Sequence, residues 1–323
     1  MNVSVSSNKI KLSQKVGKFK RYFKQNWQLY AFLLPGLLFT LVFKYIPILG
    51  NVIAFNEYDI FSPDGPILGM FTSPWVGLDH FRTLFNNMDV LNVFKNTILI
   101  SLYKIFWLQP VPIILAILIN EVRCKYFQKT VQTIYYLPHF LSWVIVSGLF
   151  LQMLGPYGPI NGFLESMGII DQPIQFFQES SFFRSLMVIT GGWKEVGWNT
   201  IVYLAALTSI DPELYEAAKI DGANKFKQII YVTIPSISST ILMLFTIRLG
   251  HIFDAGFDQV FNTYNPLVYD TGDIIGTYVY RIGIGQMNYS FSAAVAVFEA
   301  VIGLTILFIA NKVCRKYFGK GIW

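Results

Sequence analysis

A short polar stretch between two apolar segments carries residue types that suit a docking site for another protein. Asp211 is an expected N-cap and Pro212 an expected first-turn residue, so the sequence predicts that a helix begins there. Gly222 follows at a place where a left-handed backbone commonly ends a helix. Between them, Ala217 and Ala218 leave a face of low relief that another protein could approach closely. A plain surface helix that joins two neighbouring segments is the alternative interpretation.

Polar and aromatic side chains also interrupt two of the apolar segments. Glu195, Trp198 and Asn199 follow helical spacing and are predicted to share one helix face. Such a face suits a sugar, because aromatic rings stack on sugar C–H faces while polar side chains pair with hydroxyl groups. Charged groups at membrane depth usually face a cavity or a partner, although buried ion pairs between helices are an equally open interpretation. If a sugar passes along these two segments, the candidate residues of its path are Trp193, Lys194, Glu195, Trp198, Asn199, Tyr203, Arg248, His251 and Asp254, and the cations Lys194 and Arg248 would favour uronic, acidic sugars.

The composition places these residues in a membrane protein. The chain has 323 residues, of which 54% are hydrophobic and only 14% are charged, and its mean hydropathy is +0.47. Soluble domains carry about 25% charged residues. A chain this poor in charge is not expected to cover a soluble surface with polar groups. This argues against a cytosolic enzyme, a nucleic-acid binder and a disordered chain.

Six apolar segments predict an all-α polytopic membrane bundle with six transmembrane helices. The first is too long for a signal-peptide core and no small-residue cleavage site follows it, so it is predicted to be retained. The fourth gives the weakest signal, because Lys194, Glu195 and Asn199 interrupt it. The predicted helices cover residues 30–55, 93–119, 131–154, 185–207, 236–256 and 292–313, within a transmembrane domain of residues 29–315 that includes a cytoplasmic loop at 209–235; residues 1–28 form a basic N-terminal segment and residues 316–323 a C-terminal tail.

The basic residues predict the orientation. With the N-terminus inside, seventeen Lys and Arg residues fall in cytoplasmic segments and only Arg82, Arg184 and Arg281 fall in the three outer loops. Both termini are therefore predicted to be cytoplasmic. The two cysteines, Cys124 and Cys314, lie beside cytoplasmic basic clusters and are expected to be reduced thiols. The outer loops at 56–92, 155–184 and 257–291 are long and rich in turn residues and aromatic residues, which suggests an external docking surface.

The polar stretch resembles a motif of permease subunits in bacterial ATP-binding-cassette (ABC) importers. The motif appears here as Glu216-Ala217-Ala218, then Gly222, and after nine intervening residues Val232-Thr233-Ile234-Pro235, with Val232 and Ile234 as conservative departures. The segment Asp221-Gly222-Ala223 resembles the one found at this place in the carbohydrate-uptake branch of the family, whose members are binding-protein-dependent inner membrane components. Further segments look like permeases for polysaccharide fragments and complex oligosaccharides: Leu34-Pro35-Gly36, Phe43-Lys44-Tyr45-Ile46-Pro47, Leu137-Pro138-His139-Phe140, Tyr264-Asn265-Pro266-Leu267-Val268-Tyr269 and the terminal Trp323.

This resemblance implies a type I ABC importer permease fold in the bacterial cytoplasmic membrane. It implies a second homologous permease, two ABC ATPase subunits and an extracellular solute-binding lipoprotein that delivers the sugar. The chain has no G-x-x-x-x-G-K-[ST] loop, so ATP and Mg²⁺ are expected on the ATPase subunits, with no cofactor, catalytic residue or metal on this chain. The residues implied in ATPase coupling are Glu216, Ala217, Ala218, Asp221, Gly222, Ala223 and Pro235.

Three other readings are weaker. A secondary sugar transporter would need inverted repeats and no ATPase partner. A membrane-embedded enzyme would need a catalytic constellation, whereas His80, His139 and His251 fall on an outer loop and two separate spans. A permease for another solute would share the motif, and the sequence does not identify the sugar.

Overall fold

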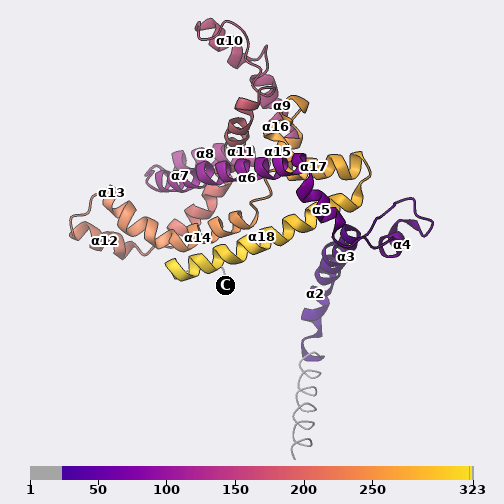
Figure 1. The fold of residues 1–323 in the computed structure, drawn as a ribbon. Helices are drawn as coiled ribbons and strands as arrows, with labels where there is room; N and C mark the ends of the chain where they lie inside the picture. Colours follow the sequence, from indigo (N-terminus) through magenta and orange to yellow (C-terminus); the bar gives the residue numbers. More distant parts are fainter. Residues whose placement is uncertain (1–23, 320, 322–323) are drawn as a thin grey trace, which may run out of the picture. The chain divides into compact units, whose positions relative to one another are not determined.

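The computed structural model describes residues 24–319 and 321, and these residues form helices and connecting loops without a strand (Figure 1). The basic residues from Lys9 to Arg21 and the terminal Trp323 lie outside the described residues. The chain divides into one unit that ends at Trp75 and a second that begins at Val76.

The first unit contains the first predicted span as an unbroken helical run. Its elements are α2 (Trp27–Thr40), η1 (Leu41–Tyr45), α3 (Ile46–Leu49), η2 (Gly50–Phe55) and α4 (Gly65–Thr72). The π-helical turn η1 ends two residues before Pro47, which has no N–H to donate to the carbonyl of residue 43. No residue of α2, η1 or α3 is buried. An apolar run of this length suits the hydrocarbon interior of a membrane.

The second unit holds the other predicted spans. Its order is α5 (Asp79–Asn86), α6 (Met88–Leu108), α7 (Pro110–Asn120), α8 (Lys125–Tyr136), η3 (Leu137–Phe140), α9 (Trp143–Met153), α10 (Pro159–Ser166), α11 (Ser180–Thr208), α12 (Pro212–Ile220), α13 (Lys225–Gln228), η4 (Ile229–Thr233), α14 (Ile234–Gly250), α15 (Phe257–Phe261), η5 (Pro266–Val268), α16 (Tyr269–Gly272), α17 (Ile275–Tyr280), η6 (Arg281–Gly285) and α18 (Tyr289–Phe318).

Four helical segments of the described chain are long and apolar enough to cross a membrane, or five if one bent pair counts as a span. They are Trp27–Phe55, Met88–Asn120, Lys225–Gly250 and Tyr289–Phe318, with Lys125–Phe140 and Trp143–Met153 as the bent pair. The 29-residue α11 is long enough, but it is absent from this set and carries Lys194 and Glu195. The predicted six helices are compatible with this arrangement.

Two predicted spans differ in detail from the structure. The third, at 131–154, is bent by 101° between η3 and α9. Pro138 is the second residue of η3, directly after α8. Ser142 has an extended backbone and is the N-cap of α9, and its hydroxyl accepts a hydrogen bond from the Ile145 amide at 3.4 Å. The fifth, at 236–256, instead belongs to a helical run that begins at Lys225 and ends at Gly250. The chain after it turns at Gly256, whose φ is +91°.

Helix α11 is the centre of the second unit. Its side chains enter two of the three apolar clusters, through Phe183 and Met187 in one and Tyr203 and Leu207 in the other. It packs against α6, α7, α8 and α14. A Cβ at Gly197 would collide with the carbonyl oxygen of Tyr135, so only glycine permits this close approach.

Polar contacts order the segment after α14. Arg281 donates two hydrogen bonds to the carboxylate of Asp273, at 3.2 and 2.5 Å. Burial opposes the charged form of Arg281, but these bonds and the charge of Asp273 outweigh it and hold the pKa of the guanidinium above its ordinary value. Arg184 donates to the Asn96 side chain at 2.8 Å and so joins α11 to α6.

Candidate coupling surface and transport path

Helix α12 has the boundaries that the sequence predicts. The Asp211 side chain accepts a hydrogen bond from the Glu213 amide at 3.0 Å, which caps the N-terminus. At the other end Gly222 has φ +77°, and its amide donates to the Lys219 carbonyl at 3.0 Å. The Ala223 amide reaches back to the Ala218 carbonyl at 2.9 Å, which completes a Schellman motif.

Most of α12 is open to an incoming protein. Glu216, Ala217, Asp221 and Gly222 are exposed, as is Pro235 near the start of α14, whereas Ala218 and Ala223 are half-buried. Two apolar side chains that sequence reasoning missed share this exposure: Leu214 is 49% exposed and Ile220 is 88% exposed. Apolar side chains on an exposed helix in a polar loop were the available signal, because such residues mark protein contact sites. Coupling through the seven residues named from the motif stays a prediction.

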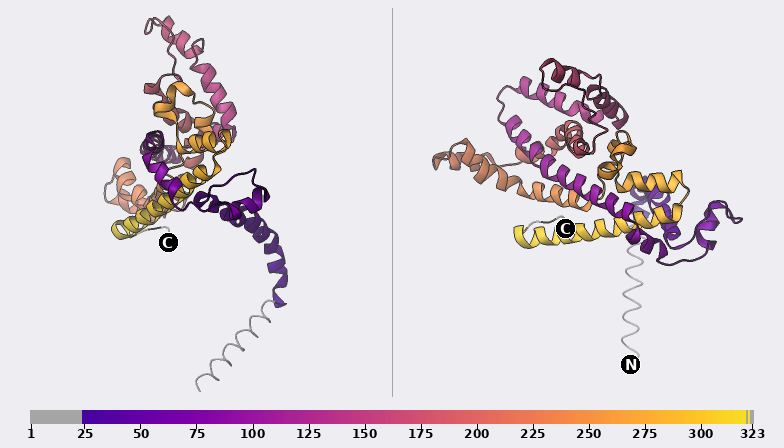
Figure 2. Two further views of the ribbon diagram at one scale, coloured as in Figure 1. Left: turned by 45° about the vertical axis from the view of Figure 1, so that its right-hand side comes forward. Right: turned by 45° about the horizontal axis from the view of Figure 1, so that its top comes forward.

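A second loop that is predicted to be cytoplasmic is joined to this region. The Lys225 ammonium at the start of α13 lies 2.6 Å from the carboxylate of Glu121, which directly follows α7. Figures 1 and 2 show α12 and α13 at the same end of the second unit as the C-terminal end of α18. The predicted cytoplasmic basic clusters that the structure describes therefore lie at one end of this unit.

A cluster of side-chain contacts joins two segments, with Lys194, Glu195 and Trp198 on α11 and His139 on η3. The Nδ1–H of His139 donates to the Glu195 carboxylate at 3.1 Å, because an ionised carboxylate can only accept. The His139 ring also stacks on Trp198, with 4.5 Å between ring centroids and 5° between planes. Lys194 Nζ donates to the His139 carbonyl at 2.6 Å and lies 3.7 Å from Glu195. His139 thus joins η3 to the polar residues of α11.

One face of α11 remains open. The Glu195 side chain is 36% exposed, Trp198 is 42% exposed, and Asn199 is half-buried beside them. Lys194, in contrast, is buried at 5% exposure and is already engaged by the His139 carbonyl. The predicted face of Glu195, Trp198 and Asn199 therefore exists, with Lys194 behind it.

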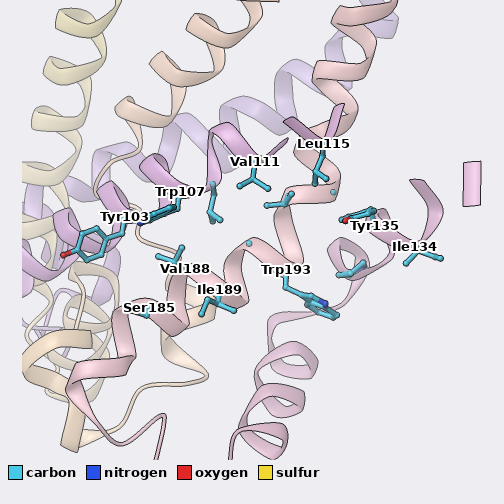
Figure 3. A pocket seen from close by; sticks show the side chains of 15 residues that line it. Tyr103, Trp107, Val111, Leu115, Ile134, Tyr135, Ser185, Val188, Ile189 and Trp193 are labelled. Atoms are coloured by element: carbon cyan, nitrogen blue, oxygen red, sulfur yellow. The ribbon is translucent and has the colours of Figure 1, made fainter. Parts of the chain in front are cut away.

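Two predicted path residues of α11, Trp193 and Tyr203, lie away from this face. Trp193 points into a pocket of about 900 Å³ that is also lined by Tyr103 and Trp107 of α6 and Tyr135 of α8 (Figure 3). Tyr203 is 2% exposed, and its hydroxyl accepts a hydrogen bond from Gln109 at 2.8 Å. The structure does not bring these two side chains together with Glu195 and Trp198.

A second cavity lies between the end of α14 and α18. Its volume is about 560 Å³, and it is lined by His251, Asp254 and Glu299 together with apolar residues. Arg248 is half-buried and does not line it. Sequence reasoning missed Glu299, for which the available signal was an acidic residue within the last apolar segment. Carboxylates and an imidazole in a cavity can hydrogen-bond with sugar hydroxyl groups.

The described residues contain no group of three or more His, Cys, Asp and Glu side chains placed to hold a metal ion. Cys124 is exposed and Cys314 is buried, and neither forms a disulfide.

Comparison with known proteins shows the family. The family described as "Binding-protein-dependent transport system inner membrane component" matches residues 109–317. The Polygalacturonan/rhamnogalacturonan transport system permease protein YteP of Bacillus subtilis (strain 168) is 41% identical over 300 residues, which cover 93% of this chain and 91% of YteP. Protein LplB of the same organism is 40% identical over 301 residues, covering 93% and 92% of the two chains.

Solved structures agree in fold. A chain in the crystal structure of a bacterial alginate ABC transporter, in complex with an alginate pentasaccharide-bound periplasmic protein, superposes with a TM-score of 0.84 at 40% identity, covering 94% of this chain and 99% of that one. A second alginate importer structure gives the same TM-score and identity, covering 93% and 99%. By these matches, the chain belongs to the family of binding-protein-dependent transport system inner membrane components.

Proposed function

We propose that this chain is one of two permease subunits of an ATP-driven importer that takes up fragments of an acidic, uronic-acid-containing polysaccharide. The second permease would complete the path, two ATPase subunits would bind on the cytoplasmic side, and an extracellular solute-binding protein would deliver the sugar. Relatives support the substrate class: one is named for polygalacturonan and rhamnogalacturonan transport, and the solved neighbours import alginate, described as an acidic polysaccharide.

The observation that carries the proposal is the exposed α12, with its N-cap, its Gly222 turn and its apolar Leu214 and Ile220. Exposed apolar side chains of this kind are buried when a partner docks. ATP and Mg²⁺ would be held by that partner. This chain would contribute the docking helix, which leads through α13 and η4 into the membrane-spanning α14.

The charged and polar groups along the candidate path are compatible with an elongated acidic sugar that makes several kinds of contact. The Glu195 carboxylate is offset by Lys194 and hydrogen-bonded by His139, so the α11 face carries little net repulsion toward uronate groups. The cavity with Asp254 and Glu299 is acidic and suits sugar hydroxyl groups instead. Trp198 offers the stacking surface between polar neighbours.

The direct test is a substrate panel. The chain, its partner permease, the ATPase subunits and the solute-binding protein would be reconstituted in proteoliposomes. We expect oligogalacturonates or alginate oligosaccharides to stimulate ATP hydrolysis, and neutral oligosaccharides of equal length to stimulate it at least about tenfold less, a difference of about 1.4 kcal/mol. Stimulation by neutral sugars alone would contradict the acidic-sugar assignment.

We also propose that both termini are cytoplasmic, and the two cysteines allow a test. Cys124 is exposed at the start of α8, whereas Cys314 is buried with its sulfur 3.5 Å from the Thr246 hydroxyl. A membrane-impermeant maleimide is expected to label Cys124 in inside-out vesicles and to leave intact spheroplasts unlabelled. Cys124→Ser should remove the label, and Cys314 should react only after unfolding. Labelling of Cys124 from the outside would reverse the topology.

A further inference from the structure

The inward face of α12 is hydrogen-bonded to the start of the fifth membrane-spanning run. Tyr215 is half-buried on α12, and its hydroxyl lies 3.0 Å from the hydroxyl of Thr233, which is 4% exposed in η4. Thr233 in turn donates to the Gln228 carbonyl at 3.4 Å. A threonine hydroxyl has one hydrogen to donate, so Tyr215 is the donor in the first bond.

Further bonds close this contact into a ring. The Gln228 side chain, which is 4% exposed, donates to the Ala223 carbonyl at 2.9 Å. The Ala223 amide donates to the Ala218 carbonyl of α12, also at 2.9 Å. A continuous path of hydrogen bonds thus runs from Tyr215 through Thr233, Gln228 and Ala223 back to α12. It spans the turn at Gly222, a residue without a side chain whose φ is +77°.

The element that receives α12 is itself irregular. Residues Ile229–Thr233 form the π-helix η4, which ends two residues before Pro235. Pro235 cannot donate to the carbonyl of residue 231, which accounts for the local widening. Such π-turns are frequent at functional sites. Beyond it, α14 continues to Gly250, next to the cavity that contains His251, Asp254 and Glu299.

We propose that Tyr215 and Thr233 are positioning residues for energy coupling, a role that rests on the function proposed above. Their hydrogen bond makes α12, the Gly222 turn and η4 move as one body. Movement of a docked ATPase subunit then displaces α14 and the cavity at its far end. Without the bond, the same movement is absorbed at the Gly222 turn, so ATP is hydrolysed with less sugar transported.

The test measures sugar transported per ATP hydrolysed in the reconstituted complex with its solute-binding protein, using an oligogalacturonate that stimulates ATP hydrolysis. Tyr215→Phe removes the hydroxyl and keeps the ring, and Thr233→Val removes the other hydroxyl. Each is expected to lower the ratio about three- to tenfold, the size expected for one part-buried hydrogen bond. The double variant should lose no more than Thr233→Val alone, because Thr233→Val already removes the bond to Tyr215 together with the bond from Thr233 to the Gln228 carbonyl. ATPase subunits should still co-purify, since the outer face of α12 is unchanged.

Two matched variants separate positioning from general damage. Tyr231→Phe makes the same chemical change in η4 at a side chain that is 74% exposed, and should leave the ratio unchanged. Thr233→Ser keeps the hydroxyl and should restore most of the coupling. An unchanged ratio in Tyr215→Phe, or additive losses in the double variant, would overturn the positioning role alone. If the unaltered chain bound no ATPase subunit, the proposed function would fail and this role with it.

Discussion

Replacing Gly222 with arginine is expected to abolish sugar-stimulated ATP hydrolysis and uptake, with a loss of at least about 100-fold. Gly222 has φ +77°, a conformation that costs a residue with a side chain about 1–2 kcal/mol. The space around its missing Cβ is open, since no heavy atom outside its immediate neighbourhood lies within 4 Å. The guanidinium would therefore project from the exposed face of α12 and prevent close docking. The expected 100-fold loss corresponds to about 2.7 kcal/mol of docking free energy.

Gly168, which follows α10, provides a control for backbone strain. Gly168 has φ +66° and open space, and it ends α10 with the same pair of hydrogen bonds that end α12. Gly168→Arg should therefore cost similar local stability but leave ATPase docking intact. The measurement is co-purification of the ATPase subunits together with sugar-stimulated ATPase activity in proteoliposomes. Unchanged stimulated activity in Gly222→Arg would refute α12 as the docking helix.

Replacing Trp198 and Asn199 together with alanine is expected to lower sugar uptake about 30-fold, through loss of roughly 2 kcal/mol of stacking and hydrogen bonding. Trp198 presents a partly exposed ring that is already held in place by the parallel His139 ring at 4.5 Å. A ring fixed in this way loses little side-chain freedom when a sugar stacks on it. Asn199 adds an amide on the same face.

The comparison variant is Trp107→Ala. It removes an indole on α6 that is 60% exposed and lines the pocket of about 900 Å³. It should leave uptake near its original level. Uptake and ATPase activity are measured on the same vesicles. A folding defect lowers both, whereas a defect in the sugar path lowers uptake more than ATPase activity. Undiminished uptake by the Trp198 and Asn199 double variant would show that these groups only join helices.

The boundaries of α12 could be predicted from sequence because their signals are local. Asp211, Pro212 and Gly222 influence only residues within about one helical turn. The structure shows the Asp211 cap, the helix start at Pro212 and the left-handed turn at Gly222 that these residues predict. The exposed Leu214 and Ile220 were missed because their exposure depends on how α12 lies against η4. The spans were equally local, since a long apolar run is sufficient to predict a membrane helix. The bend of 101° after η3 was not predicted, because it depends on the extended backbone of Ser142.

By itself, the sequence determined a membrane helix bundle and the ends of α12, and it predicted an orientation and a docking role, since apolar runs, basic clusters and helix caps act through neighbours along the chain. The tertiary structure decided which polar groups meet. It stacked His139 on Trp198 and turned Trp193 toward a separate pocket. It also placed Glu299 beside Asp254 in one cavity. Those pairings join residues far apart in the chain and follow from helix packing, such as the close approach at Gly197, which helical spacing alone does not specify.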